Sequence, residues 1–338
     1  MKFEYFEYKR PDYEQVKAEL EQWFARLSAS RSAGEAIRCA VEIDKIRQNY
    51  ISMKNLSGLQ FSIDTTNPDY VRENDYFDEY WPYYKELNAR YYQELLRSPQ
   101  LDALRDFYGE QFIRLAECTV RTIDERILPE LQEEAKLVSA SFKFKTDAIV
   151  EFRGEKMNLS VLSGYMLSDD AATRAEAAKA YYGYFESIQD TVDDIYDKLV
   201  KVRDKKAKKL GYKNFVEMGY NEMTRTDYDA EMVARFREQV KEHIVPVVGR
   251  LIERQKKRLG VTELPYYDEP IRFLSGNARP FGTPDEILAQ AKGMYADMSP
   301  ETGEYFRYML DNDLIDVLPR PGKEGSGFCS YIGTYRAP

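Results

Sequence analysis

The sequence predicts a mainly α-helical globular protein, and three observations lead to that prediction. Apolar residues recur every three or four positions over most of the chain, as one face of a helix requires. Residues that start or stop helices stand at the ends of these runs. Segments that alternate like a β-strand are few, and 338 residues with 43% hydrophobic content can bury a large core.

Four helical runs are expected in the first part of the chain. The apolar positions from Val16 to Leu27 define the first run, and the same spacing recurs in the others. The predicted helices cover residues 12–30, 34–55, 69–97 and 101–137. Pro82 and Pro129 lie within the last two runs, and each removes a backbone donor, so we expect a kink or a break there.

Three more helices follow. Ser168 is a suitable N-cap, with Asp169 and Asp170 in the first turn of the helix it starts. A run over 190–210 ends in lysines before Gly211, which suits a left-handed cap. The ladder from Met232 to Leu251 predicts one long helix over 229–259, bent at Pro246. The basic stretch 201–211 is interpreted as a solvated helix face.

Only two segments favour strands. Residues 148–162 hold two β-rich runs around a charged turn at Gly154, which predicts a small hairpin. The run FCSYIGTY, residues 328–335, predicts a C-terminal strand. The loop-rich stretch 261–285 contains four prolines and marks a boundary between two lobes, 1–260 and 261–338.

Charge and cysteine content limit the classes of partner and the compartment. With 49 Lys and Arg against 58 Asp and Glu, the net charge is −9, which argues against nucleic acid as the main partner. Cys39, Cys118 and Cys329 are odd in number and far apart, so no disulfide framework is predicted. Without a signal peptide or a membrane-length apolar run, we expect a cytoplasmic protein with no membrane partner.

The residues themselves offer no complete catalytic constellation. His243 is the single histidine, whereas a helical zinc-hydrolase motif needs two, four residues apart, to face one metal ion. We therefore interpret His243 as a packing or surface residue. The phosphate-binding patterns GxxxxGK[ST] and GxGxxG are absent from the sequence.

Several long stretches nevertheless carry a family pattern. They are FSIDTTNPDYVRENDYFDE at 61–79, RLAECTVRTIDERILPELQEEAKL at 114–137, YDKLVKVRDKKAKKLGY at 196–212 and GKEGSGFCSYI at 322–332. In this order, and over essentially the whole chain, the sequence resembles the oligoendopeptidase F-like branch of the thimet-oligopeptidase family of zinc metallopeptidases. The resemblance implies a multi-helix, two-lobed peptidase scaffold with a deep channel.

The resemblance also implies a catalytic helix with an HExxH motif and a downstream glutamate as third zinc ligand. Neither is present here, so it implies the N-terminal part of a zinc-dependent oligoendopeptidase, truncated before the HExxH helix. Zinc would be the cofactor of the full-length member, in which zinc-activated water hydrolyses short unstructured peptides. The chain alone is expected to bind no zinc and to be inactive. Its partners would be an oligopeptide substrate and the missing C-terminal catalytic segment.

A non-catalytic helical peptide-binding or scaffold protein is the alternative. The final residues YIGTYRAP break off within an apolar strand region, which would leave an unpaired edge and favours truncation.

The resemblance places one piece of the channel wall in this chain. It implies that an extended peptide pairs with the backbone of a strand formed by the predicted substrate-binding residues Gly325, Gly327, Phe328, Cys329, Ser330 and Tyr331. The two glycines would allow close approach. An internal strand whose partner lies elsewhere remains an alternative for this segment. Cys329 is interpreted as a small buried residue rather than a nucleophile.

Overall fold

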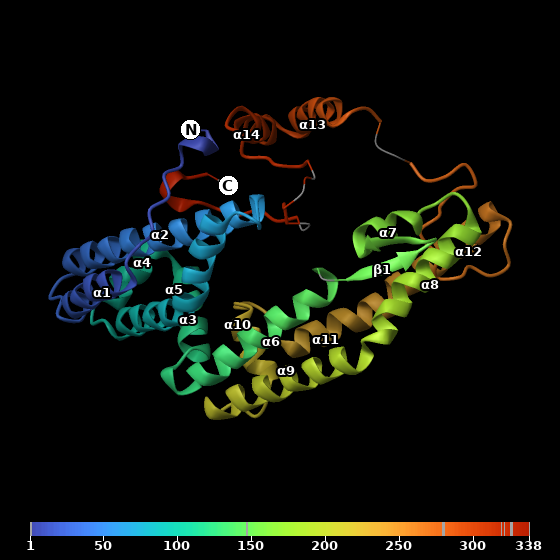
Figure 1. Ribbon diagram of the computed structural model, residues 1–338. Coiled ribbons are helices and arrows are strands. Elements are labelled where there is room, and N and C mark those ends of the chain that lie inside the picture. Colours follow the sequence, from blue (N-terminus) through green and yellow to red (C-terminus); the bar gives the residue numbers. More distant parts are fainter. Residues whose placement is uncertain are drawn as a thin grey trace. The chain divides into compact units, whose positions relative to one another are not determined.

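The chain runs from one structural unit into a second and then returns to the first (Figure 1). In the computed structural model, residues 2–146, 148–278, 281–318, 320, 322–324 and 327–337 are described. The first unit combines Met1–Ile123 with Pro280–Pro338, and the second is Asp124–Arg279. The lobe boundary that the sequence suggested at residue 260 thus falls inside the second unit.

Every regular secondary-structure element in the described residues of the first unit is a helix, and loops join these helices. Its elements are the short 3-10 helix Phe3–Tyr5, α1 (Tyr13–Ser28), α2 (Ala33–Ile63), α3 (Pro68–Arg97), α4 (Leu101–Tyr108), α5 (Glu110–Thr122), α13 (Pro284–Met298), α14 (Pro300–Asp311) and the 3-10 helix Gly333–Tyr335. Side chains of Asp12, Ser32 and Asn67 cap the first three helices by accepting backbone N–H bonds.

The second unit contains the one sheet found among the described residues. Its elements are the 3-10 helix Glu125–Ile127, α6 (Leu128–Thr146), β1 (Ile149–Phe152), β2 (Glu155–Asn158), α7 (Leu159–Tyr165), α8 (Ala171–Ser187), α9 (Gln189–Lys209), α10 (Phe215–Glu222), α11 (Ala230–Gln239), the π-helical turn Val240–Ile244 and α12 (Val245–Leu259). Strands β1 and β2 pair antiparallel, with Val150 opposite Met157.

The mainly α fold and the small hairpin are therefore confirmed, while some boundaries are corrected. The run 101–137 is not one helix, because Gly109 adopts φ +86° and separates α4 from α5, and Pro129 stands at the start of α6. The helix expected to start at Ser168 starts later. Asp170, not Ser168, accepts the N–H of Thr173 and caps α8.

The core of the first unit lies between α1, α2, α3, α4 and α5, which Figure 1 shows in blue to teal. Tyr50 of α2 stacks on Tyr84 of α3 with ring centroids 4.1 Å apart, and both rings are buried. Arg47 lies beside them and donates to Asn88 and Tyr92, so its buried guanidinium is satisfied. These contacts make α2 a fixed support for what packs on its far end.

Loop 261–278 belongs to the second unit because two buried polar side chains hold it. The guanidinium of Arg174 in α8 pairs with Asp268, its Nη2 lying 2.6 Å from Oδ1. The buried amide of Gln255 in α12 donates to the carbonyls of Glu269 and Ile271. Since the loop's own backbone groups need partners, these side chains fix its course.

The basic stretch 201–211 is only in part the solvated face that the sequence suggested. Lys206 is 1% exposed and pairs with Glu134 of α6 and Glu222 of α10. Lys205 and Lys209 both reach Glu130, whose side chain is almost fully buried. The lysines therefore join α9 to α6 and α10.

None of the helices described combines the length and the apolar content that crossing a membrane requires.

Candidate functional site

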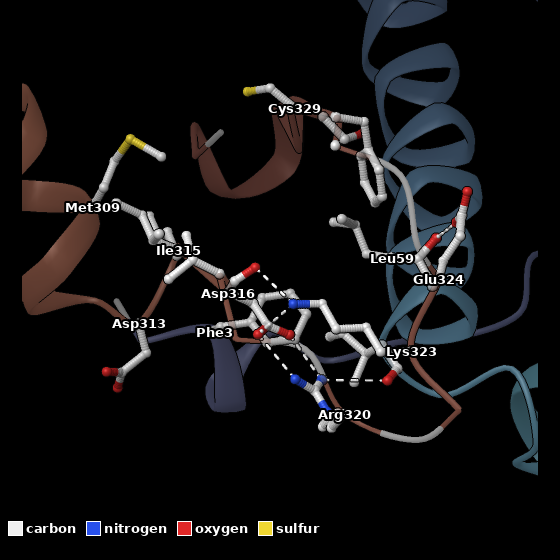
Figure 2. A pocket seen from close by; sticks show the side chains of 17 residues that line it. Phe3, Leu59, Met309, Asp313, Ile315, Asp316, Arg320, Lys323, Glu324 and Cys329 are labelled. Atoms are coloured by element: carbon white, nitrogen blue, oxygen red, sulfur yellow. Dashed lines mark hydrogen bonds and ion pairs between the residues drawn. The ribbon is translucent and has the colours of Figure 1, made fainter. Parts of the chain in front are cut away.

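A cavity of about 580 Å³ opens in the first unit, between the end of α2 and the segment that follows α14 (Figure 2). Its lining residues come from the N-terminus, α2, α14 and the two stretches after it. They are Phe3, Leu59, Ser62, Ile63, Met309, Asp313, Leu314, Ile315, Asp316, Val317, Arg320, Lys323, Glu324, Gly327, Phe328, Cys329 and Ser330. Most of this lining is apolar, and Asp316, Arg320 and Lys323 are joined to one another by hydrogen bonds.

Arg320 and Lys323 both bind the carboxylate of Asp316, and we call these three residues the ionic clamp of the cavity. Arg320 binds Asp316 with two bonds, Nη1 to Oδ1 at 2.9 Å and Nη2 to Oδ2 at 2.8 Å. Lys323 reaches the same carboxylate at 2.8 Å and also donates to the carbonyls of Asp316 and Leu318, as the dashed lines in Figure 2 mark in part. The Arg320 hydrogen bonds, helped by Lys323, lower the pKa of Asp316 to about 2.

The loop that carries Lys323 is held at the C-terminal end of α2 by hydrogen bonds to Ser62 and Thr65. The carbonyl of Gly322 accepts from the N–H of Thr65 at 2.7 Å and from its hydroxyl at 2.8 Å. The N–H of Glu324 donates to the carbonyl of Ser62 at 2.9 Å, and the Ser62 hydroxyl donates back to the Glu324 carboxylate. Gly322 has φ +80°, and a Cβ there would lie 2.8 Å from Asp64 Oδ1, so the position favours glycine on two grounds.

The cavity brings together four of the six substrate-binding residues that the sequence suggested. Gly327, Phe328, Cys329 and Ser330 line it. Tyr331 does not, although its carbonyl accepts a hydrogen bond from Asn55 Nδ2 at 3.0 Å while its ring is exposed. Gly325 lies outside the described residues. Whether these residues bind a peptide remains a prediction.

Two details of the predicted C-terminal strand are wrong. Residues 327–331 form no strand, because no other described segment pairs with their backbone. Ile332 and Ala337 form an isolated antiparallel bridge around the short helix Gly333–Tyr335. Cys329, expected to be buried, is an exposed free thiol, whereas Cys39 and Cys118 are buried free thiols.

The segment 332–337 packs tightly rather than presenting an apolar edge. Ile332 and Ala337 are fully buried, and Tyr335 stacks on Phe6 with ring centroids 4.2 Å apart. A Cβ on Gly333 would approach the Gln48 side chain to 2.7 Å, which shows how closely the segment lies on α2. This anchoring holds the neighbouring residues 327–330 at the cavity.

Sequence reasoning missed the clamp formed by Asp316, Arg320 and Lys323. In the sequence Arg320 stands between Pro319 and Pro321, and this proline pair is the available signal of a fixed loop. The apolar wall formed by Phe3 and Leu59 carried no such signal, because these residues come from distant parts of the chain.

The described residues do not fit a zinc site. Within the described residues, no group of three or more His, Cys, Asp or Glu side chains is placed to hold a metal ion. His243 is an exposed side chain in the π-helical turn, and its Nε2 lies 4.0 Å from a carboxylate oxygen of Glu242. The cavity combines an apolar lining with a few charged groups, the arrangement typical of small-ligand sites in proteins.

Comparison with known families finds two matches. A model described as the Peptidase M3 N-terminal domain matches residues 3–123, and one described as Peptidase family M3 matches residues 164–279. The first match ends where the first segment of the first unit ends, and the second match ends with the second unit. A search of curated protein sequences found no match.

Solved structures similar to this chain point the same way. A protein assigned as an oligoendopeptidase F from Bacillus anthracis is 42% identical with a TM-score of 0.90, over 98% of this chain and 61% of its own. PZ peptidase A, solved with an inhibitor, is 41% identical with a TM-score of 0.93, over 99% of this chain and 60% of its own. The chain thus spans about three-fifths of the length of these relatives.

Proposed function

Since the chain belongs to peptidase family M3, we propose that it forms the helical body and part of the substrate channel of a zinc-dependent oligoendopeptidase. The whole protein would hydrolyse peptide bonds in short unstructured peptides. The observation that carries the proposal is the high similarity in sequence and fold to oligoendopeptidase F over 98% of this chain. Because the described residues do not fit a zinc site, the proposal assigns the metal to residues outside this chain.

The cavity in the first unit is the proposed binding surface. Its apolar lining, which includes Leu59 and Phe328, suits one side chain of a bound peptide. Among the described residues no strand pairs with residues 327–330, and the backbone groups of this segment can pair with an extended peptide main chain. Main-chain pairing tolerates many sequences, as a peptidase that acts on diverse oligopeptides requires.

The proposal includes a cytoplasmic location. All three cysteines are free thiols, and two of them are buried, which suits a reducing compartment.

Peptide binding and peptide cleavage test different parts of this proposal. The purified chain is mixed with a fluorescent quenched oligopeptide and Zn²⁺, with a chelator control, while anisotropy reports binding. We expect saturable binding without chelator-sensitive cleavage. Absence of binding would reject the cavity as a peptide site, and chelator-sensitive cleavage would show that the chain itself holds the catalytic metal.

A matched pair of variants locates the binding surface. Phe328→Ala removes an exposed ring of the cavity and should weaken peptide binding by about tenfold. Phe107→Ala removes a similarly exposed ring of α4 outside the cavity and should leave binding unchanged. Equal effects of the two variants would argue against this cavity. The alternative function, peptide binding without catalysis, gains support if the whole protein also binds but never cleaves.

A further inference from the structure

The N-terminal segment, residues 2–8, supplies one side chain to the lining of the cavity in the first unit. Among the lining residues that the structure describes, Phe3 is the one that comes from this segment (Figure 2). The N–H of Phe3 donates to the carbonyl of Asn312 at 3.0 Å, and Lys2 Nζ lies 3.0 Å from Asp313 Oδ2. Segments from distant parts of the sequence therefore meet at the cavity.

Aromatic contacts give the Phe3 ring a defined position. Phe3 packs on Phe6 with ring centroids 5.6 Å apart, and Phe6 stacks on Tyr335 at 4.2 Å. The Tyr335 hydroxyl accepts from the N–H of Glu7 at 2.8 Å and donates to the carbonyl of Glu7 at 3.1 Å. Phe6 is buried in one cluster with Ile332. Because Phe6 and Tyr335 are both fixed in this way, the half-buried Phe3 ring has a firm support beside the cavity.

A ring held at this place restricts the space that a ligand can use. The other apolar lining residues belong to α2, such as Leu59 and Ile63, or to the stretch 309–330. Well-packed sites transmit small changes in volume, so an entering group must fit beside the Phe3 ring. One methylene group more or less in an apolar pocket changes relative affinity by about 10- to 200-fold.

We infer that Phe3 is a specificity-determining residue of the proposed peptide site. Its ring limits the size of the apolar peptide side chain that the cavity accepts. The inference rests on the proposed function for the nature of the ligand, and it adds the residue that selects among peptides. Residues 6 and 335 act through Phe3, because they hold its ring in position without lining the cavity.

Short fluorescent peptides that differ in one central residue measure this selection. The central residue is Ala, Leu, Phe or Trp, and anisotropy gives the Kd of each peptide for the purified 338-residue chain. The quantity compared between variants is the ratio of the Kd values of the Leu and Trp peptides. A variant that only disturbs the cavity weakens all four peptides together and leaves this ratio where it was.

Two substitutions at Phe3 should move the ratio in opposite directions. Phe3→Ala opens space beside the bound side chain and should favour the Trp peptide over the Leu peptide by about tenfold relative to the unchanged chain. Phe3→Trp reduces the space and should favour the Leu peptide. Tyr5→Ala is the matched control, because this ring of the same 3-10 helix is 61% exposed and is not among the described lining residues. It should leave the ratio unchanged.

The outcomes separate this inference from the proposed function. Phe3→Leu keeps an apolar contact with Phe6 and repeats the test in a milder form if Phe3→Ala fails to fold. Binding of all peptides with one ratio in every Phe3 variant would refute the inference and leave the peptide site standing. Equal weakening of all four peptides would assign Phe3 to the support of the cavity and also refute it. Absence of any binding to the unchanged chain would reject the peptide site itself, and the role of Phe3 with it.

Discussion

Replacing Lys206 should show how far the second unit depends on its buried ion cluster. Lys206 is 1% exposed, and its Nζ lies 2.7 Å from Glu134 Oε2, with Glu222 as a second partner. The ammonium also lies 5.3 Å from the centre of the Phe215 ring. In Lys206→Met the two carboxylates lose this cation while staying largely away from water.

The expected cost follows from the exposure of the partners. Removing one member of a fully buried pair costs about 3–5 kcal/mol, because an uncompensated charge is left behind. Glu134 keeps Arg203, and Glu222 is 28% exposed, so the lower end of this range, about 3 kcal/mol, applies. For a unit of this size that corresponds to a fall in Tm of about 6–12 °C.

Thermal unfolding followed by circular dichroism and calorimetry measures the effect. Lys201→Met in the same helix is the matched control, because Lys201 and its partner Asp197 are both well exposed. It should leave the free energy of unfolding nearly unchanged, because an exposed ion pair contributes little to stability. The double variant Lys206→Met with Glu134→Leu should recover part of the loss. The reasoning fails if Lys206→Met melts like its control, or if the double variant is additively worse.

Three further predictions concern backbone strain, the cavity clamp and acid pH. Gly322→Ala, which forces a side chain at φ +80° against Asp64, should destabilise the first unit by about 1–3 kcal/mol in denaturant unfolding. Gly58→Ala, inside α2 with open space around it, should stabilise by about 0.5–1 kcal/mol, and a loss in both variants would contradict the strain argument. Asp316→Asn should increase the hydrogen exchange of residues 322–324. It should leave global stability within about 1 kcal/mol, because the clamp is partly exposed. Unchanged exchange would show that the clamp does not hold the loop. Burial acts to raise the pKa of Glu134, but hydrogen bonds from Lys206 and Arg203 outweigh burial and lower this pKa. The contribution of the Glu134 carboxylate to folding stability is therefore present above pH 4.5 and is lost as the pH falls through the folded pKa. Stability of the second unit measured from pH 7 to 3 should therefore fall in the acid range, and less so in Glu134→Gln.

The cavity illustrates where prediction from sequence stops. Residues 327–330 were selected from a resemblance to a family motif, and the structure places all four at the cavity. Their supposed strand is absent from the described residues, because a strand is defined by a partner and a single segment carries no information about one. Asp316 and Lys323 were missed because a clamp between loop residues has no periodic signature.

The sequence by itself determined the helical class, the hairpin around Gly154 and the membership of peptidase family M3. Periodicity, turn residues and family motifs are properties of short stretches of sequence, so they can be recognised without the fold. It also determined, by containing a single histidine, that no HExxH metal site can be built from these 338 residues. Only the tertiary structure decided that Lys206 is buried, that Phe236, Ile244 and Leu251 are exposed, and that the end of α2 lines a cavity. The same apolar spacing describes a covered and an uncovered helix face, because burial depends on which distant segments pack against it.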